Sequence, residues 1–170
     1  MEPMAESIRL PEAYGKPSKL LFWPDVEARL IEAMHYWLAT ARPDGRPHVV
    51  PVDGIWHDGA CYFGGDPATV HERNLRADSH AVIHLDDSES ATIVEGRAER
   101  HAPSESEAEA LASASKSKCG YAPPPAAYRD GVWRLVPVTV LAWNVLYEDA
   151  TRFRFAAVSE AGSRPRQPSR

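Results

Sequence analysis

Apolar runs separated by turn residues between positions 36 and 63 predict three short strands joined by tight turns. Tyr36–Ala41 is an apolar, aromatic-rich run, and the residues at 42–45 place proline and glycine where a type I turn favours them. Residues 46–56 are dominated by β-branched side chains and are interpreted as one second strand. The Asp-Gly pair at 58–59 is typical of a tight hairpin, so Ala60–Phe63 is expected to be the third strand.

The pattern then changes to that of a helix followed by two more strands. Asp66 is expected to be the N-cap of this helix and Pro67 its first residue, with the end at Asp78. Strand-like runs follow at residues 80–85 and 90–100, separated by a polar turn. The predicted order is therefore three strands, a helix and two strands.

Helices are also expected on both sides of this sheet. The first opens at residues 23–25 and should pack on the sheet through one apolar stripe, made of Val26, Leu30, Ile31 and Met34. Ser104 and Glu107 have the spacing of a capping box, which predicts a helix with a thin apolar face that ends at residues 119–120.

The last part of the chain is predicted to be a connector and a hairpin. The three prolines at 123–125 are interpreted as an extended connector that cannot be helical. Strands are expected at residues 132–143 and 151–155. Residues 1–156 should form one domain, and the Pro-, Ser- and Arg-rich residues 157–170 a disordered tail.

Four strings carry a resemblance to a known family: LATARPDGRPHVVPV, GACYFGG, HERNLRAD and IVEGRAER. Their order and spacing resemble the pyridoxamine phosphate oxidase-like family over residues 24–155. The resemblance implies a mainly β (α+β) fold, a split β-barrel of antiparallel strands with peripheral helices. It also implies a homodimer that holds FMN or a deazaflavin at its interface and acts as an oxidoreductase on a small molecule. No catalytic residue is assigned, because hydride transfer to or from a flavin needs no protein nucleophile.

The resemblance also implies which residues hold the cofactor ring. Main-chain groups near Thr40 and along the second strand should contact it, at His48, Val49, Val50, Pro51 and Val52. Without the resemblance the same residues are interpreted as a buried sheet. Trp143 is expected close to the partner subunit's cofactor. Arg152 either meets an anionic cofactor or substrate or lies on a solvent-exposed edge strand.

At the phosphate end this chain departs from the family pattern. FMN-binding members have a basic residue on the second strand and a Ser-Arg-Lys run before the helix. These positions are His48 and the Thr-Val-His run at 69–71 here, with Arg73 nearby. Three alternatives stay open: the tail is held by His71, Arg73 and the helix N-terminus at Thr69; the ligand is the longer, acidic 8-hydroxy-5-deazaflavin coenzyme; or cofactor binding is lost. A protonated His71 should make binding tighten as the pH falls from about 7.5 to 6.

Composition narrows the remaining function classes. A net charge of −5, from 19 basic and 24 acidic residues, argues against a nucleic-acid partner. The absence of a signal-like or membrane-spanning run makes the cytoplasm the expected location. Cys61 and Cys119 are isolated thiols, and the scattered histidines predict no metal site. The rival function is a non-enzymatic protein of the same fold that sequesters a cofactor or another small ligand.

Overall fold

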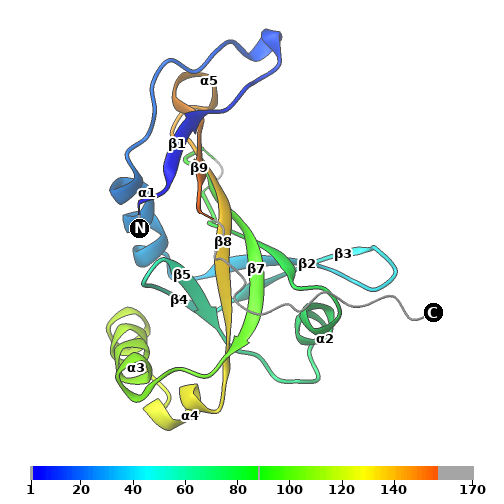
Figure 1. Ribbon diagram of the computed structural model, residues 1–170, viewed down its shortest axis with the longest axis vertical. Coiled ribbons are helices and arrows are strands. Elements are labelled where there is room, and N and C mark those ends of the chain that lie inside the picture. The colour runs from blue at the N-terminus through cyan, green and yellow to red at the C-terminus, as the bar shows by residue number, and fades with distance from the viewer. Residues whose placement is uncertain (1, 88, 157–170) are drawn as a thin grey trace, which may run out of the picture.

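The computed structural model describes residues 2–87 and 89–156, which form an antiparallel sheet with peripheral helices (Figure 1). The strands are β1 (Met4–Ser7), β2 (Tyr36–Ala41), β3 (Pro47–Val52), β4 (Gly54–His57), β5 (Ala60–Phe63), β6 (His80–His84), β7 (Thr92–His101), β8 (Val132–Ala142) and β9 (Thr151–Arg154). The helices are α1 (Trp23–Glu32), α2 (Val70–Ala77), α3 (Glu105–Cys119), α4 (Pro125–Arg129) and α5 (Leu146–Asp149), with a short 3₁₀ turn at Glu12–Tyr14.

The long strand β8 splits the sheet, because its two halves have different partners on the same edge. Its first half pairs with β5, where Leu135 faces Cys61, and its second half pairs with β9, where Val140 faces Phe153. β7 runs along the other edge of β8, and the sheet continues through β6 and β2 to β3. The sheet is not closed, so the architecture is the expected split β-barrel with peripheral helices.

Helix α1 fills the larger hydrophobic core, although not through the whole stripe that the sequence predicts. Trp23, Val26 and Leu30 are buried against the curved sheet. Ile31 and Met34 are 54% and 49% exposed, so their inclusion in the stripe was wrong. The reason is that Trp23 begins the inward row and rotates the buried face away from Ile31, while the helix ends at Glu32 before Met34.

A second, smaller core lies between the α3–α4 pair and the outer side of β4, β5 and β8, at the lower left of Figure 1. α3 buries only Ala108 and Leu111, which confirms its thin apolar face. The Ser104 hydroxyl accepts the Glu107 N–H at 3.3 Å, as the N-cap prediction requires. Gly120 ends the helix in the left-handed conformation, also as predicted.

Two boundaries near the candidate site differ from the sequence prediction. Residues 46–56 form two strands, β3 and β4, because the chain changes partner at Asp53 from β2 to β5. The helix expected from Asp66 begins at Val70 instead. The Asp66 carboxylate accepts the Ala68 N–H at 2.8 Å, so it caps a turn that precedes the helix.

Two further differences concern the ends of the sheet. Pro125 is the first residue of α4, so the fully extended connector was wrong; a proline fits the first helical turn, where its missing N–H is not needed. β1 was not predicted, and it covers β9, so Arg152 is not on an exposed edge strand. Arg152 and Arg154 both contact Glu6 of β1, at 3.3 and 2.8 Å. The predicted tail, 157–170, lies outside the described residues.

Candidate functional site

The alternation of β3 divides its predicted ring-binding residues between two faces of the sheet. His48 faces Thr40 across the β2–β3 pair, and Val50 and Val52 lie on the same side as His48. Val49 and Pro51 lie on the opposite, outer face, and Val49 is 50% exposed. Among the described residues, the free edge of β3 has no strand partner, so its main-chain groups are open to a ligand or a partner.

Helix α2 covers the inner side of β2 and β3 and brings four predicted residues together. Asn74 of α2 donates to the Thr40 hydroxyl at 2.9 Å, in a buried contact. Thr69 Oγ1 lies 3.4 Å from His71 Nε2, and His71 is close enough to His48 for the two charges to interact. Thr40, His48, Thr69 and His71 therefore form one polar cluster between α2 and the β2–β3 pair, with Thr69 and His71 at the start of the helix and Thr40 beside Asn74.

The loop that leads into α2 packs closely against this cluster at Gly65. A Cβ atom at Gly65 would overlap His71 Nε2. Thr69 is the N-cap of α2, and in the described part of the chain no side chain caps the first turn. The N–H groups of that turn are therefore positioned to bind an anion, helped by the helix dipole.

His71 differs from the cationic anchor that the sequence suggests. Burial lowers the pKa of His71, and the nearby Glu72 carboxylate opposes this shift without cancelling it. The imidazole is therefore neutral at pH 7 and takes up its proton at a lower pH than an ordinary histidine does. No local sequence pattern indicates this burial, because it depends on the glycine loop packed against position 71.

Arg73 does not join the cluster. Its side chain is exposed, and its guanidinium donates to the Ala68 carbonyl. Among the described residues, no side-chain hydrogen bond or ion pair connects Arg73 to Thr69 or His71. The polar groups gathered at the start of α2 are thus a hydroxyl, a neutral imidazole and main-chain N–H groups.

Trp143 and Arg152 lie at a different part of the sheet, on the same outer face as Val49 and Pro51. The main-chain N–H of Trp143 donates to the Ala91 carbonyl at 3.1 Å. This contact lies next to the end of β8 that is remote from the α3–α4 pair. Arg152 belongs to a cross-strand row that is followed beyond β9 by Glu6 of β1. The members up to β9 face one another on successive strands: Pro51, Trp37, His84, Ile93, Leu141 and Arg152. We call this the outer-face row. Most of its members are apolar or aromatic, and all are at least partly exposed.

A cleft of about 590 Å³ lies beside the polar cluster, between α2 and the α3–α4 pair. Pro51, Gly65 and His71 form the side that it shares with the cluster. Further along, the cleft is lined by Glu72, Arg76 and Arg100, which the sequence did not single out as a group. The Glu72–Arg76 spacing of four residues could have predicted a helical ion pair from the sequence. The contact of Arg100 from β7 with Glu72 could not be predicted in this way.

In residues 2–87 and 89–156, no three His, Cys, Asp or Glu side chains converge as metal ligands. Within the same residues, no helix has the length and apolar character needed to cross a bilayer.

Comparison with known proteins identifies the family. Residues 22–144 match the family described as pyridoxamine 5'-phosphate oxidase. The chain belongs to this family. No curated protein matches the chain.

Solved structures with a similar fold include three proteins of different kinds. A conserved hypothetical protein, Rv2991 from Mycobacterium tuberculosis, is 19% identical with a TM-score of 0.62, covering 76% of this chain and 88% of its own. An F420 reductase is 24% identical with a TM-score of 0.52, covering 67% and 94%. A heme-binding protein from Mycobacterium smegmatis is 22% identical with a TM-score of 0.57, covering 86% and 60%. At these identities the likeness shows the shared fold alone.

Proposed function

We propose that this member of the pyridoxamine 5'-phosphate oxidase family is a homodimeric oxidoreductase that binds FMN, or alternatively a deazaflavin, along β3. The observation that carries the proposal is the open edge of β3 next to the uncapped start of α2, where Thr69 and His71 meet. A planar ring finds main-chain donors and acceptors on one side of this arrangement, and an anionic tail finds N–H and O–H donors on the other.

The residues present fit an anionic tail through hydrogen bonds in place of basic side chains. The first-turn N–H groups of α2 would donate to the phosphate, and the Thr69 hydroxyl would join them when it turns away from His71 Nε2. Neutral His71 has a single N–H, which is directed to the main chain of Gly64, so it adds no further donor. Gly65 allows the main chain to approach closely. Arg73 is a secondary contributor, because it must leave the Ala68 carbonyl to reach the tail. A bound flavin would supply the hydride-transfer chemistry.

The second copy of the chain completes the site. The outer-face row supports this, since a partly exposed apolar band across six strands is typical of a protein–protein interface. Trp143 and Arg152, which lie away from His71 in one protomer, then approach the cofactor of the partner. Burial of the band is the driving force for two-fold association.

Titration of the full chain with FMN and, separately, with 8-hydroxy-5-deazaflavin tests the proposal by quenching of cofactor fluorescence. Thr69→Val should weaken FMN binding by about 1.5–3 kcal/mol, the range for hydrogen bonds to charged groups, while Thr69→Ser restores it. Arg73→Gln should have the smaller effect. A bound flavin should also be bleached by a nicotinamide donor. A chain that takes up neither cofactor contradicts the proposal and favours the rival, a binding protein for another small ligand.

A further inference from the structure

A buried carboxylate stands in the wall of the cleft between α2 and the α3–α4 pair. The side chain of Glu72 is 1% exposed, yet it lies in the first turn of a helix whose neighbouring residue Arg73 is exposed. A carboxylate is removed from water at a large cost unless positive charges and hydrogen bonds compensate it. The burial of Glu72 therefore requires compensating positive groups in the same wall of the cleft.

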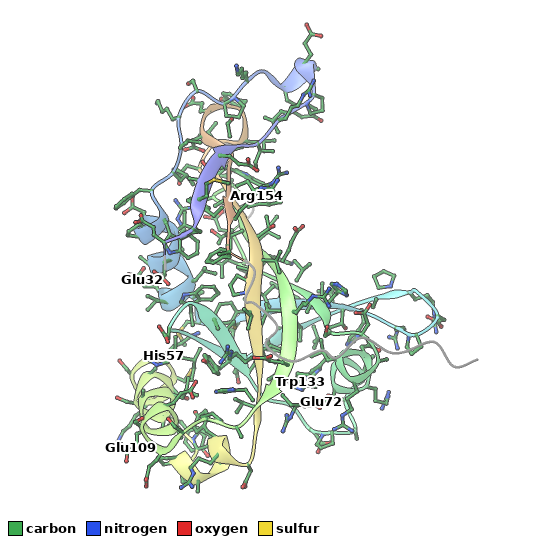
Figure 2. The ribbon with its side chains drawn as sticks, viewed as in Figure 1. Glu32, His57, Glu72, Glu109, Trp133 and Arg154 are labelled. Atoms are coloured by element: carbon green, nitrogen blue, oxygen red, sulfur yellow. The ribbon has the colours of Figure 1, made fainter. Side chains whose placement is uncertain are left out.

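Two arginines from different elements meet at this carboxylate. Arg76, one turn along α2, places Nη2 3.3 Å from Glu72 Oε2, and Arg100 of β7 places Nη1 3.9 Å from Glu72 Oε1. Arg100 is fixed further by a 2.9 Å hydrogen bond to the Gly131 carbonyl and by the Trp133 ring, whose centroid lies 5.5 Å away. Glu72 and Trp133, both partners of Arg100, are labelled in Figure 2.

The two arginines are held in place by their partners but keep free N–H donors. The Arg76 and Arg100 side chains are 57% and 48% exposed, and both line the cleft. Each guanidinium has five N–H donors in a fixed fork, and the contacts above occupy a minority of them. One carboxylate between two guanidiniums leaves a net charge of +1. The remaining donors can thus bind one anionic group at this end of the cleft.

The rest of the cleft suits an apolar, flat body. Its lining includes the apolar side chains of Ile55, Phe63 and Val132, together with Tyr128 of α4, which packs with Ile55 and Val132 in the smaller core. These side chains are all buried within the fold, so their cleft-facing surfaces are pre-formed. His71 and Gly65 border the other end, next to the proposed cofactor position. A ligand held by the arginines would lie with its apolar body pointing toward that position.

We infer that Arg76 and Arg100, positioned by Glu72, are the anion-recognition end of the substrate cleft. The substrate class is a small molecule with an apolar, planar body and one terminal anionic group, such as an aromatic carboxylate. This inference rests on the proposed function in calling the ligand a substrate; the binding site itself is independent of it. The competing explanation is that the ion pairs serve only to dock α2 against β7.

Binding of 2-naphthoate to the full chain, compared with its neutral isostere 2-naphthamide, separates the two explanations. Calorimetric titration should give at least tenfold tighter binding of naphthoate, with an advantage that shrinks as salt rises. Arg76→Gln and Arg100→Gln should each remove most of this advantage, and Arg76→Lys should keep part of it, because it retains the charge but loses the fork. Arg97→Gln is the matched control, since Arg97 is an exposed arginine of β7 outside this cleft.

Equal affinity for naphthoate and naphthamide, or unchanged naphthoate binding in both glutamine variants, would overturn the inference. Thermal unfolding checks that the variants fold; if Arg100→Gln unfolds, the largely exposed Arg76 decides the test alone. Titrations run without and with added FMN keep the two proposals distinguishable. Arginine-dependent naphthoate binding by a chain that binds no cofactor supports the anion site and contradicts the oxidoreductase. Cofactor binding without naphthoate selectivity contradicts the anion site alone.

Discussion

At the scale of single residues, Lys118 connects the two hydrophobic cores. Its ammonium donates to the Gly54 carbonyl at 2.6 Å and lies 4.5 Å from the centroid of the Tyr36 ring. Burial lowers the pKa of Lys118, which shows that its surroundings disfavour the charge. The lysine nevertheless satisfies a main-chain carbonyl at the junction of β3 and β4, where the strand changes partner.

Replacement of Lys118 by methionine should therefore destabilise the fold. Methionine keeps the packing over the Tyr36 ring but leaves the Gly54 carbonyl without its donor, at a cost of about 1–3 kcal/mol. Urea unfolding measures the change as a lower midpoint with an unchanged slope. Lys116→Met, an exposed position on the same helix, should stay within about 0.5 kcal/mol of the wild type. A Lys118 variant as stable as the Lys116 control would show that the contact carries no net stability.

His71 gives a second prediction at this scale, because its lowered pKa determines whether the free energy of unfolding rises or falls with pH. The unfolded chain, with a histidine pKa near the ordinary 6.5, takes up a proton before the folded chain does. The free energy of unfolding should therefore fall as the pH drops below 6.5 toward the lower folded pKa. Proton NMR of the imidazole gives that pKa directly, and His71→Gln should flatten the pH dependence of stability. An imidazole that titrates at or above 6.5 would contradict the burial argument.

These residues also show what the sequence could and could not predict about the site. The hydroxyl at Thr69 and the imidazole at His71 were identified from their positions in the family pattern, and the structure places them together. Arg73 had the right charge and position, but its orientation toward the Ala68 carbonyl depends on local geometry. The pairing of Glu72 with Arg100 joins a helix to a distant strand, and no local pattern encodes such a contact.

At the scale of elements, α3 is held to the barrel by polar contacts at both of its ends. Near its start, the Glu107 carboxylate accepts from the Tyr62 hydroxyl at 2.9 Å and lies 3.0 Å from His101 Nε2. Near its end, Lys118 donates to the Gly54 carbonyl. Because the helix buries so few apolar side chains, these contacts decide how firmly it closes one side of the cleft.

Glu107→Ala should loosen the α3–α4 pair without unfolding the sheet. Burial raises the pKa of Glu107, but hydrogen bonds from His101 and Tyr62 outweigh it, so the pKa lies below its ordinary value of 4.5. The contact is therefore intact above about pH 4.5 and is lost as the pH falls through the lowered folded pKa. Hydrogen exchange at neutral pH should accelerate in α3 and α4 but not in β7. A Glu107–His101 double-mutant cycle should give a coupling of about 0.5–1 kcal/mol.

Glu105→Ala provides the matched control, since Glu105 occupies the first turn of the same helix and is exposed. It should leave hydrogen exchange in α4 unchanged. Equal acceleration in both variants would mean that general loosening of the helix, and not the contact to β5 and β7, explains the effect.

The elements themselves were predictable wherever local signals were complete. The Asp-Gly turn between β4 and β5 has positive φ angles of 47° and 73° at Asp58 and Gly59, as its sequence required. The division of residues 46–56 was not predictable, since β-branched residues continue through the point where the partner changes. β1 was also missed, because its four residues gain strand structure only by pairing with β9 from the far end of the chain.

At the scale of the whole molecule, the outer-face row is an apolar surface that remains partly exposed in one protomer. Ile93 and Leu141 face each other near its centre, and Trp37 stacks on His84 with ring centroids 6.4 Å apart. A band of this kind, open to water, is stabilised when a second copy covers it. The family resemblance predicts a dimer. The strand register identifies the residues that we expect to contact the second copy.

Ile93→Glu should therefore convert a dimer into a folded monomer. A carboxylate in the centre of the row would be buried without a partner at a two-fold interface, a change that costs several kcal/mol by desolvation. Sedimentation at micromolar concentration should show a dimer for the wild type and a monomer for the variant, with the same circular dichroism. Ile31→Glu is the control, because Ile31 is 54% exposed on α1 and lies outside the row. The monomer should also lose most FMN affinity, since Trp143 and Arg152 of the partner would be absent. A monomeric wild type, or a monomeric variant with full FMN affinity, would contradict a composite site and leave the cofactor to be held by one protomer alone.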